Sequence, residues 1–552
     1  MNPKLVEQAR AWMSGDPDEG DRATIGALLD AGDDEELTRR FATPLTFGTA
    51  GLRGPLMAGP AGMNRYTVRR ATQGVVAWLH QIGVDPIRGV VVGRDARHGS
   101  EAFNDEVVSV LLGAGVRVFE MPGPLPTPLL AYTVKAYRAA AGIMITASHN
   151  PAADNGFKLY ASDGAQILPP HDQTVERLAS RAGEAVLGSR TSVLYSRVAP
   201  DVLVQYRRHF SQRFGVSTGS TLAITYTPLH GVGGTTMVEL FDSARFASVT
   251  VVDSQFAPDG DFPTLAFPNP EEPGALDLAM AAADEANSSL VIANDPDADR
   301  LGVAVRNSQG WRVLRGDEIG WLLASALIPE MVAGEDVVAT SIVSSTMLKK
   351  MAQVARIRYV ETLTGFKWIA RARNEGVLRF GYEEALGFAV DPLVADKDGM
   401  SAALALCQLA DRLARDGHTL LDRLDEIETR YGVHAGRQLS LRVEGPGGHQ
   451  RIADALRRLR KARPGKLGDL AVSELVDLTK GWHGLAPTEG LVFMLFDRGR
   501  VVVRPSGTEP KLKAYIEILG GPARERTLGE QRHAAAIQLE AVSRDLEARL
   551  AL

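Results

Sequence analysis

The chain has 552 residues, of which 45% are hydrophobic and 23% charged, and its formal net charge is −6. This length exceeds what a single hydrophobic core supports, so several domains are expected. The acidic balance excludes a nucleic-acid binder that relies on an overall basic field, and the single cysteine, Cys407, excludes an intramolecular disulfide and a cysteine-based metal site.

The remaining bulk features favour a cytoplasmic protein. Sparse cysteine is typical of a reducing compartment. The acidic first residues lack the basic start and apolar run of a secretory signal. No apolar stretch reaches the about 20 residues that a membrane-spanning helix needs. We therefore expect a soluble protein with neither membrane nor nucleic-acid partners.

Short apolar strands alternate with longer helical patterns along most of the chain, which is typical of α/β layers. The acidic first forty residues have a helical pattern of their own. The strands end in polar, glycine-rich loops, where open α/β sheets bind ligands. In chain order we predict a strand at 89–92, a helix at 101–113, strands at 116–121 and 140–148, a helix from Pro200, strands at 220–231, 247–254 and 288–300, and helices at 317–327 and 420–432.

Three segments have the mixed composition of linkers, at 183–197, 307–316 and 433–448. Beyond residue 437 the pattern changes to a strand, a strand–turn–strand pair over 491–506 and a further strand at 512–519. Consecutive strands joined by a short turn differ from the preceding part of the chain, where strands alternate with helices. We predict a separate α+β domain for this last part.

The segment NDPDADRLG, residues 294–302, predicts a metal site. Asp295, Asp297 and Asp299 alternate directly after an apolar run, and carboxylates so close together repel unless a cation neutralises them. An all-oxygen ligand set suits magnesium or calcium better than zinc. An EF-hand calcium loop is excluded because its glycine and glutamate positions hold Arg300 and Arg306. A solvated acidic turn is the alternative.

The segment TASHNPAADNGFK, residues 146–158, places Ser148 in a loop just after a strand. A serine can carry a phosphoryl group when a cation binds the phosphate and a base handles the proton. Serine in an Asn/Pro/Gly loop is more commonly a turn former. The catalytic interpretation therefore depends on the metal site.

Three further loops carry groups suited to anions or sugars. RPSGTEPKLK, residues 504–513, offers a guanidinium, hydroxyls and loop amides to a phosphate, or is a hairpin turn. FGTAGLRG, residues 47–54, lacks the Gly-Lys-Ser/Thr ending of a Walker loop and is a candidate backbone nest. GYEEALG, residues 381–387, presents two glutamates that either accept sugar hydroxyls or form a surface acidic turn.

Taken together and in their order along the chain, these five motifs resemble the α-D-phosphohexomutase superfamily of phosphoglucomutases and phosphomannomutases, over nearly the whole chain. The resemblance implies an α/β fold with four-domain phosphohexomutase architecture, in which three related mixed α/β domains and a C-terminal α+β domain surround a central cleft. The expected domains are 1–200 with the phosphoserine loop and a helical extension over about 1–40, 201–314 with the metal loop, 315–436 with the sugar loop, and 437–552 with the phosphate loop.

The resemblance also implies roles for individual residues. Ser148 is similar to the family's phosphoserine and, with the three aspartates, to its magnesium ligands. Arg53 and Arg300 would lie beside it, and His149 and Lys158 resemble the general acid/base groups. The residues expected to bind substrate are Thr364, Gly365, Glu383, Glu384, Lys397, Arg504, Ser506, Gly507 and Thr508.

The implied reaction is an intramolecular phosphotransfer between hexose 1-phosphate and hexose 6-phosphate, with Mg²⁺ as cofactor and glucose 1,6-bisphosphate or an equivalent as activator. The expected partner is a small sugar phosphate, and the expected assembly is a monomer or a homodimer. The sugar loop, EEALG, is closer to a branch that includes pentose-phosphate mutases, so a phosphopentomutase is the alternative.

Two other classes are weaker candidates. A haloacid-dehalogenase-like phosphatase would account for DPDAD but leaves Ser148 and the arginine loop at 504 without a role. A phosphosugar-binding protein without activity would tolerate the loss of Ser148 or of one aspartate, yet all are present.

Overall fold

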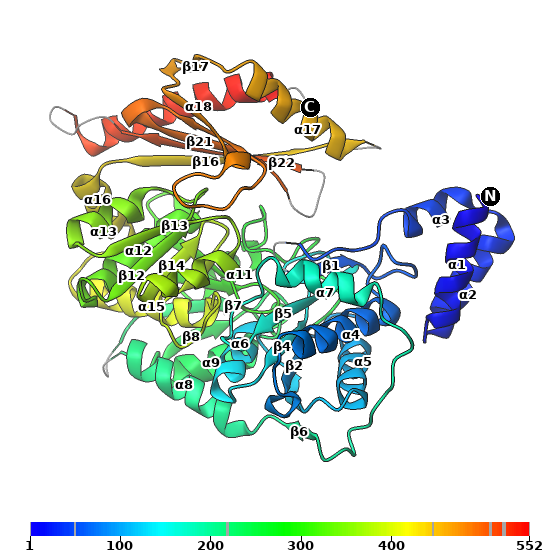
Figure 1. The fold of residues 1–552 in the computed structure, drawn as a ribbon. Coiled ribbons are helices and arrows are strands. Elements are labelled where there is room, and N and C mark those ends of the chain that lie inside the picture. Colours follow the sequence, from blue (N-terminus) through cyan, green and yellow to red (C-terminus); the bar gives the residue numbers. More distant parts are fainter. Residues whose placement is uncertain are drawn as a thin grey trace. The chain divides into compact units, whose positions relative to one another are not determined.

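The computed structural model describes residues 2–48, 51–216, 220–443, 447–506, 511–520 and 526–550. The chain forms two compact units, whose elements are labelled in Figure 1. The first unit comprises Met1–Leu314 and Leu386–Asp411, and the second comprises Arg315–Ala385 and Arg412–Leu552. Within the described ranges, no helix has the length and apolar character needed to cross a membrane.

The first unit begins with three helices that share a small core of their own. Trp12 and Phe41 pack edge to face within it. The second helix is capped by the Asp18 side chain, which accepts hydrogen bonds from the amides of Gly20 and Asp21. The helical pattern predicted for the first forty residues is thus confirmed. The helices are α1 (Pro3–Gly15), α2 (Glu19–Ala31) and α3 (Asp34–Phe41).

A six-stranded sheet follows, in the order β1-β5-β4-β2-β3-β6. Its β2, β3, β4 and β6 are parallel, whereas β5 runs antiparallel to β4 and β1. Buried side chains of α4, α5 and α7 cover one face, and Gly93 and Gly142 let α6 approach the other closely. The elements are β1 (Leu52–Pro55), α4 (Arg65–Gln81), β2 (Val90–Arg94), α5 (Ser100–Gly113), β3 (Val118–Pro124), α6 (Thr127–Ala136), β4 (Ala141–Ile145), β5 (Asp154–Ala161), α7 (His171–Ala179) and β6 (Tyr195–Arg197).

The second sheet of this unit has the order β11-β10-β9-β7-β8. Two expectations were wrong in part. The predicted linker at 307–316 contains β11, because a tight turn between Asn307 and Gly310 lets the chain pair antiparallel with β10. The predicted linker at 183–197 ends in β6, which pairs with β3. The elements are α8 (Pro200–Phe214), β7 (Ala223–Thr227), α9 (Gly234–Ser243), β8 (Ser248–Val251), α10 (Asp253–Phe256), α11 (Asp277–Glu285), β9 (Leu290–Asn294), β10 (Leu301–Asn307), β11 (Gly310–Val313), β15 (Gly387–Ala389) and α15 (Gly399–Arg415).

The second unit contains a parallel run of strands in the order β13-β12-β14. The buried strand β12 is apolar along its middle and polar at its carboxyl end. There it runs into the loop 341–346, which contains three serines and is called the serine-rich loop below. The elements of this part are α12 (Gly316–Leu327), β12 (Asp336–Ser341), α13 (Met347–Ala355), β13 (Arg358–Thr362), α14 (Phe366–Ile369), β14 (Val377–Glu383) and α16 (Leu420–Tyr431).

The same unit ends in an antiparallel sheet of order β16-β22-β21-β20-β19, as the change of pattern beyond residue 437 predicts. Helices α17 and α18 share a core with the sheet. Val502 and Tyr515 pack instead against Ile342 and Val343, which follow β12. The elements are β16 (His434–Arg442), α17 (Gly448–Lys461), β17 (Lys466–Leu467), β18 (Leu470–Ala471), β19 (Glu474–Asp477), β20 (Leu491–Met494), β21 (Gly499–Pro505), β22 (Lys511–Leu519) and α18 (Leu528–Leu550).

Candidate active site

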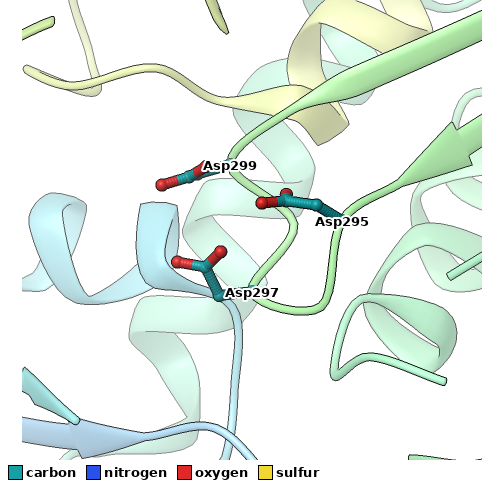
Figure 2. A group of neighbouring side chains, drawn as sticks. All are labelled: Asp295, Asp297 and Asp299. Atoms are coloured by element: carbon teal, nitrogen blue, oxygen red, sulfur yellow. The ribbon is translucent and has the colours of Figure 1, made fainter. Parts of the chain in front are cut away.

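Three carboxylates meet in the loop between β9 and β10 of the first unit. Asp295, Asp297 and Asp299 are fully buried, and one oxygen from each lies within 4.8 Å of the others. Figure 2 shows the three side chains projecting from one turn of the loop. The turn is made tight by Ala298, which has a left-handed backbone with φ of 55°. The alternating spacing in the sequence therefore does gather three carboxylates at one point.

Two lysines lie against these carboxylates. Lys158, from β5, donates to Asp297 Oδ2 at 2.5 Å and to Asp299 Oδ2 at 2.8 Å. Lys397 Nζ lies 2.7 Å from the same Asp299 oxygen. Burial acts to raise the pKa of Asp299, but the two ammonium groups hold it below its usual range. Lys397, predicted as a substrate contact, is thus placed in the carboxylate cluster.

Asp295 differs from the other two carboxylates. Its Oδ2 accepts a hydrogen bond of 2.7 Å from Ser148 Oγ, and its Oδ1 accepts one of 2.9 Å from the Arg300 amide. Burial, and then the neighbouring Asp299 and Asp297, raise its pKa. Asp295 therefore joins the serine loop directly to the carboxylate cluster.

The donor set fits a hard divalent cation. Asp297 Oδ1 and Asp299 Oδ1 are buried and lack a hydrogen-bond partner among the described residues. Buried carboxylate oxygens without donors are costly unless they bind a cation. Three convergent carboxylates with a hydroxyl alongside match the all-oxygen preference of Mg²⁺.

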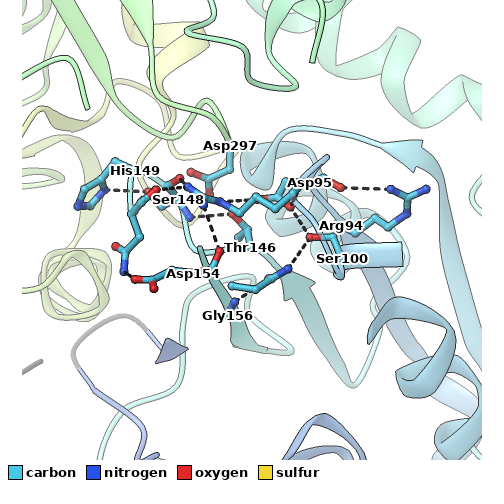
Figure 3. A network of polar contacts seen from close by, with 12 residues as sticks. Arg94, Asp95, Ser100, Thr146, Ser148, His149, Asp154, Gly156 and Asp297 are labelled. Carbon is cyan, nitrogen blue, oxygen red and sulfur yellow. Dashed lines mark hydrogen bonds and ion pairs between the residues drawn. The ribbon is translucent and has the colours of Figure 1, made fainter. Parts of the chain in front are cut away.

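Ser148 lies in the loop between β4 and β5 and is almost entirely buried. Its backbone is left-handed, with φ of 52°, a conformation that costs about 1 kcal/mol or more for a residue other than glycine. The Ser148 amide donates to Thr146 Oγ1 at 2.9 Å, and Ser148 Oγ lies 3.1 Å from His149 Nδ1 (Figure 3). The loop thus holds the hydroxyl between a carboxylate and an imidazole.

A single guanidinium holds this strained loop in place. Arg97 donates to the carbonyl oxygens of Ser148 at 2.6 Å, Asn150 at 2.5 Å, Pro151 at 2.7 Å and Asp154 at 3.1 Å. The planar fork of arginine can bind several acceptors in fixed directions, which lysine cannot do. No sequence motif distinguished Arg97 as a functional residue. Its only signal was its place in a polar loop just past the carboxyl end of a strand.

The remaining predicted catalytic groups lie in the same cluster. Arg53, on β1, donates to Asn150 Oδ1 at 3.4 Å, and the nest expected around it includes residues 49 and 50, which fall outside the described ranges. Arg300 lies 3.5 Å from Glu271 and 4.0 Å from Asp295. Burial, and then Arg300 and Arg53, hold the pKa of His149 well below its ordinary value. This imidazole is therefore neutral at physiological pH.

The two glutamates of the predicted sugar loop lie in the second unit and accept hydrogen bonds from neutral donors. Glu384 Oε2 accepts hydrogen bonds from Ser344 Oγ at 2.8 Å and from Ser341 Oγ at 3.2 Å. Glu383 Oε1 accepts one of 2.6 Å from the amide of Gly365, which follows Thr364 and is itself a predicted substrate contact. The structure thus brings Gly365 and Glu383, both predicted to bind substrate, together.

The predicted phosphate loop begins at the end of β21 in the same unit. Arg504 pairs with Lys513 across the β21–β22 ladder, and the Ser506 amide donates to the Lys511 carbonyl at 2.8 Å. Gly507 and Thr508 lie outside the described residues. The hairpin geometry expected for this segment is present up to that point.

Family models confirm the resemblance in all four parts of the chain. The models described as phosphoglucomutase/phosphomannomutase, alpha/beta/alpha domains I, II and III, match residues 44–185, 204–310 and 315–431. The model of the C-terminal domain matches residues 441–528. The chain belongs to the phosphoglucomutase/phosphomannomutase family. It is therefore a phosphomutase of the α-D-phosphohexomutase superfamily, and the predicted four-domain fold class is confirmed.

Relatives of this mutase are named for different sugar substrates. A Haemophilus influenzae protein named "Probable phosphomannomutase" is 38% identical over 83% of this chain and 93% of its own length. The phosphopentomutase of Mus musculus is 34% identical over 95% of this chain and 91% of its own. The phosphoglucomutase of Staphylococcus aureus is 33% identical over 88% and 91%. The relatives establish the mutase reaction and leave its sugar open.

A solved structure supports the fold of the mutase independently. The crystal structure of the exocytosis-sensitive phosphoprotein pp63/parafusin from Paramecium, a phosphoglucomutase in its open form, matches with a TM-score of 0.71. The match covers 92% of this chain and 96% of that chain at 18% identity. The two chains therefore share the fold at low sequence identity.

Proposed function

We propose that the enzyme interconverts hexose 1-phosphates and hexose 6-phosphates through phospho-Ser148 and a hexose bisphosphate. The observation that supports this most directly is the 2.7 Å hydrogen bond from Ser148 Oγ to Asp295 within the buried carboxylate cluster. A serine in that position can carry a phosphoryl group, because cationic groups surround the place where the phosphate charges would lie. Those groups are Arg53, Arg300 and Lys158.

The cation that we propose for the cluster is Mg²⁺, with Asp295, Asp297, Asp299 and phosphorylated Ser148 as its ligands. The two carboxylate oxygens without donors support this assignment. When bound, the ion would withdraw charge from the phosphoryl group during transfer. Its ligands come from two loops that the hydrogen bond between Ser148 and Asp295 already joins.

Two protein groups would handle the protons of the transfer. In the first step the free hydroxyl oxygen of the sugar monophosphate attacks the phosphorus, and the bond from phosphorus to Ser148 Oγ breaks. The hydroxyl proton passes to a base, for which the neutral His149 is the candidate, and the buried Lys158 ammonium is the candidate acid that protonates the departing Ser148 oxygen. When Ser148 is phosphorylated again, the base takes the Ser148 proton and the acid returns one to the sugar oxygen.

Between the two steps the bisphosphate must turn around, so that its other phosphate faces Ser148. Sugar hydroxyls would bind Glu383 and Glu384 in either orientation, and the non-reacting phosphate would bind Arg504, Ser506, Gly507 and Thr508. Added glucose 1,6-bisphosphate would act as activator by phosphorylating Ser148.

A phosphopentomutase acting on ribose phosphates is the second candidate. One observation favours it: the mouse phosphopentomutase aligns with 95% of this chain, whereas the Haemophilus influenzae protein, at higher identity, aligns with 83%. The pentose enzyme would use the same serine, cation and proton-transfer groups. The two candidates therefore differ in the sugar alone.

Turnover of glucose 1-phosphate, mannose 1-phosphate and ribose 1-phosphate tests both candidates. Each is assayed with Mg²⁺ and a trace of glucose 1,6-bisphosphate, and kcat/KM values are compared. We expect Ser148→Ala to lower kcat by more than about 10⁴-fold, because the variant lacks the hydroxyl that we propose as the phosphoryl carrier. Ser180→Ala is the control, since Ser180 is an exposed serine of the same domain whose hydroxyl donates to the Arg177 carbonyl.

Each outcome has a definite meaning. Turnover of a hexose phosphate that is lost in Ser148→Ala supports the proposal and ranks the sugars. Turnover of ribose 1-phosphate alone would show that the enzyme is a phosphopentomutase, with the proposed mechanism unchanged. Unchanged turnover in Ser148→Ala contradicts the role of Ser148.

A further inference from the structure

Arg500 lies on β21, the strand that ends at the predicted phosphate loop, and is almost fully buried. Side chains two and four positions apart on a strand share a face. Arg500, Val502 and Arg504 therefore lie on one face, over about 13 Å. Val502 packs against Ile342 and Val343, which follow β12. This face of the C-terminal sheet thus contacts the part of the unit that carries the sugar loop.

One arm of the Arg500 guanidinium leads to Glu384. Its Nη2 donates to the Ser344 carbonyl at 3.0 Å, and Ser344 Oγ donates to Glu384 Oε2 at 2.8 Å. Ser341 and Ser344 hydroxyls are also bonded to each other at 2.9 Å. A displacement of the Ser344 backbone would therefore move the donors that orient the Glu384 carboxylate.

The other arm leads toward Glu383. Arg500 Nη1 donates to Glu361 Oε1 at 2.7 Å, and Glu361 immediately precedes Thr362 at the end of β13. The chain then enters the segment whose Gly365 amide donates to Glu383. The Arg500 guanidinium is thus connected to Glu384 through Ser344, and to Glu383 through Glu361 and the segment that ends at Gly365.

A second contact, made by Glu517, also holds the C-terminal sheet against the serine-rich loop. Glu517 is opposite Arg500 on β22, and its Oε1 accepts hydrogen bonds from Ser345 Oγ at 2.6 Å and from the Thr346 amide at 2.8 Å. The sheet contributes the buried charges of Arg500 and Glu517, and the loop contributes the hydrogen-bonding groups that satisfy them. Moving the sheet away from the loop would leave these charges without partners in the interior. The strand is therefore fixed to the serine-rich loop.

We propose that Arg500 is a positioning residue, which sets the spacing between the phosphate-binding end of β21 and the two glutamates of the sugar loop. This spacing selects the length of the sugar phosphate. A hexose 6-phosphate is longer than a pentose 5-phosphate by one carbon, so a fixed spacing favours one of the two. The inference rests on the proposed function, because it takes Glu383, Glu384 and Arg504 as substrate contacts.

The test is the ratio of kcat/KM for glucose 1-phosphate to that for ribose 1-phosphate, in the full-length enzyme and in Arg500→Lys. Lysine keeps the charge but cannot hold Ser344 and Glu361 in fixed directions. We expect kcat/KM for the preferred sugar to fall about 10-fold or more and the ratio to move toward one, because one carbon is worth about 10-fold to 200-fold in a fixed pocket. Glu361→Gln, which weakens one arm only, should shift the ratio less.

Arg315→Lys is the matched control. Arg315 also donates within the same unit, to the Gly436 carbonyl at 2.9 Å, and pairs with Glu318 at 3.4 Å. Among the described residues, these hydrogen-bond and ion-pair contacts lie outside the serine-rich loop. Its replacement should leave the sugar ratio unchanged. Melting temperatures of all variants, and the rate at which phospho-Ser148 is lost to water, separate a folding defect from a change of position.

The outcomes separate this inference from the proposed function. If the wild type turns over neither sugar, the proposed function is wrong. If it does, and Arg500→Lys keeps the wild-type sugar ratio, the positioning role is wrong, whatever its melting temperature. An equal fall in kcat/KM for both sugars also contradicts it, because a purely structural role lowers both alike.

Discussion

The carboxylate cluster of the first unit and the sugar loop of the second present acidic groups in different ways. Asp297 and Asp299 are fully buried and lie against two lysines. Glu383 and Glu384 are only partly buried and accept hydrogen bonds from an amide and from serine hydroxyls. Desolvated charges must be paired, whereas carboxylates near solvent can be held by neutral donors.

This difference indicates how the two regions tolerate change. In the carboxylate cluster any lost group leaves a buried charge without its partner, so substitutions there should slow the reaction strongly and equally for every sugar. In the sugar loop, substitutions that move a neutral donor should alter which sugar is preferred. The following predictions test that distinction, beginning with the largest expected effect.

Among the variants that compare the two regions, the largest effect is expected for Asp297→Asn. Loss of one negative ligand weakens cation binding, and at a few kcal/mol of transition-state stabilisation the expected fall in kcat is about 10²-fold to 10³-fold. It should be equal for hexose and pentose phosphates, and excess Mg²⁺ should restore part of it. Removal of divalent ions with EDTA should abolish wild-type activity until Mg²⁺ is added.

The control for this variant is Asp261→Asn, because Asp261 is an exposed acid of the same domain, paired with His98 at 2.7 Å. Its activity and Mg²⁺ requirement should remain those of the wild type. Wild-type Mg²⁺ dependence in Asp297→Asn would rule out the triad as the cation site.

An intermediate effect is expected for Arg97→Lys. Lysine cannot bind four carbonyl oxygens, so the strained Ser148 backbone should relax and the hydroxyl should leave its position. A misplacement of about 1 Å can cost about 100-fold, and we expect kcat to fall about 10-fold to 100-fold with no change of sugar preference.

Arg94→Lys provides the comparison for Arg97→Lys. Arg94 is in the same polar segment, contacts Glu101 at 3.4 Å and donates to the Asp95 carbonyl at 3.3 Å. Single-turnover phosphoryl transfer from phosphorylated enzyme measures the step directly. Equal rates in the two variants would contradict the clamping role of Arg97.

The smallest effect is expected for Asp317→Asn in the second unit. Asp317 accepts hydrogen bonds from the Ser345 amide at 2.8 Å and from Tyr382 Oη at 2.9 Å. Burial raises its pKa from 3.8 to about 6, against the opposing effect of the Ser345 amide. Because the folded state then binds the proton more tightly than the unfolded state, the free energy of unfolding falls as pH rises from about 4 to about 6.

An asparagine at this position keeps both acceptor contacts and removes the ionisation. Asp317→Asn should therefore show a flatter dependence of stability on pH and should be more stable than the wild type at pH 7, by roughly 1 to 2 kcal/mol. Urea unfolding at several pH values measures the difference. Parallel pH curves for the two proteins would show that Asp317 does not titrate in this range.

Local patterns in the sequence accounted for a large part of the fold. Strands such as 140–148 and 288–300 were predicted from short apolar runs that end in polar loops, and β4 and β9 lie there. The strand pair over 491–506 likewise corresponds to β20 and β21. The linker predicted at 307–316 failed because β11 is short and partly exposed, which leaves no apolar run to detect.

The sequence by itself determined which residue types make up the cluster, since three alternating aspartates and a serine after a strand already predict a cation site and a candidate phosphoryl carrier. The tertiary structure alone decided which distant groups complete it: Lys397 against Asp299, Arg97 beneath the Ser148 loop, and Arg500 between Ser344 and Glu361. The physical reason is that alternation along a strand or turn is local, whereas these contacts depend on strand order and sheet packing. Residues more than fifty positions apart meet only once the sheets have formed.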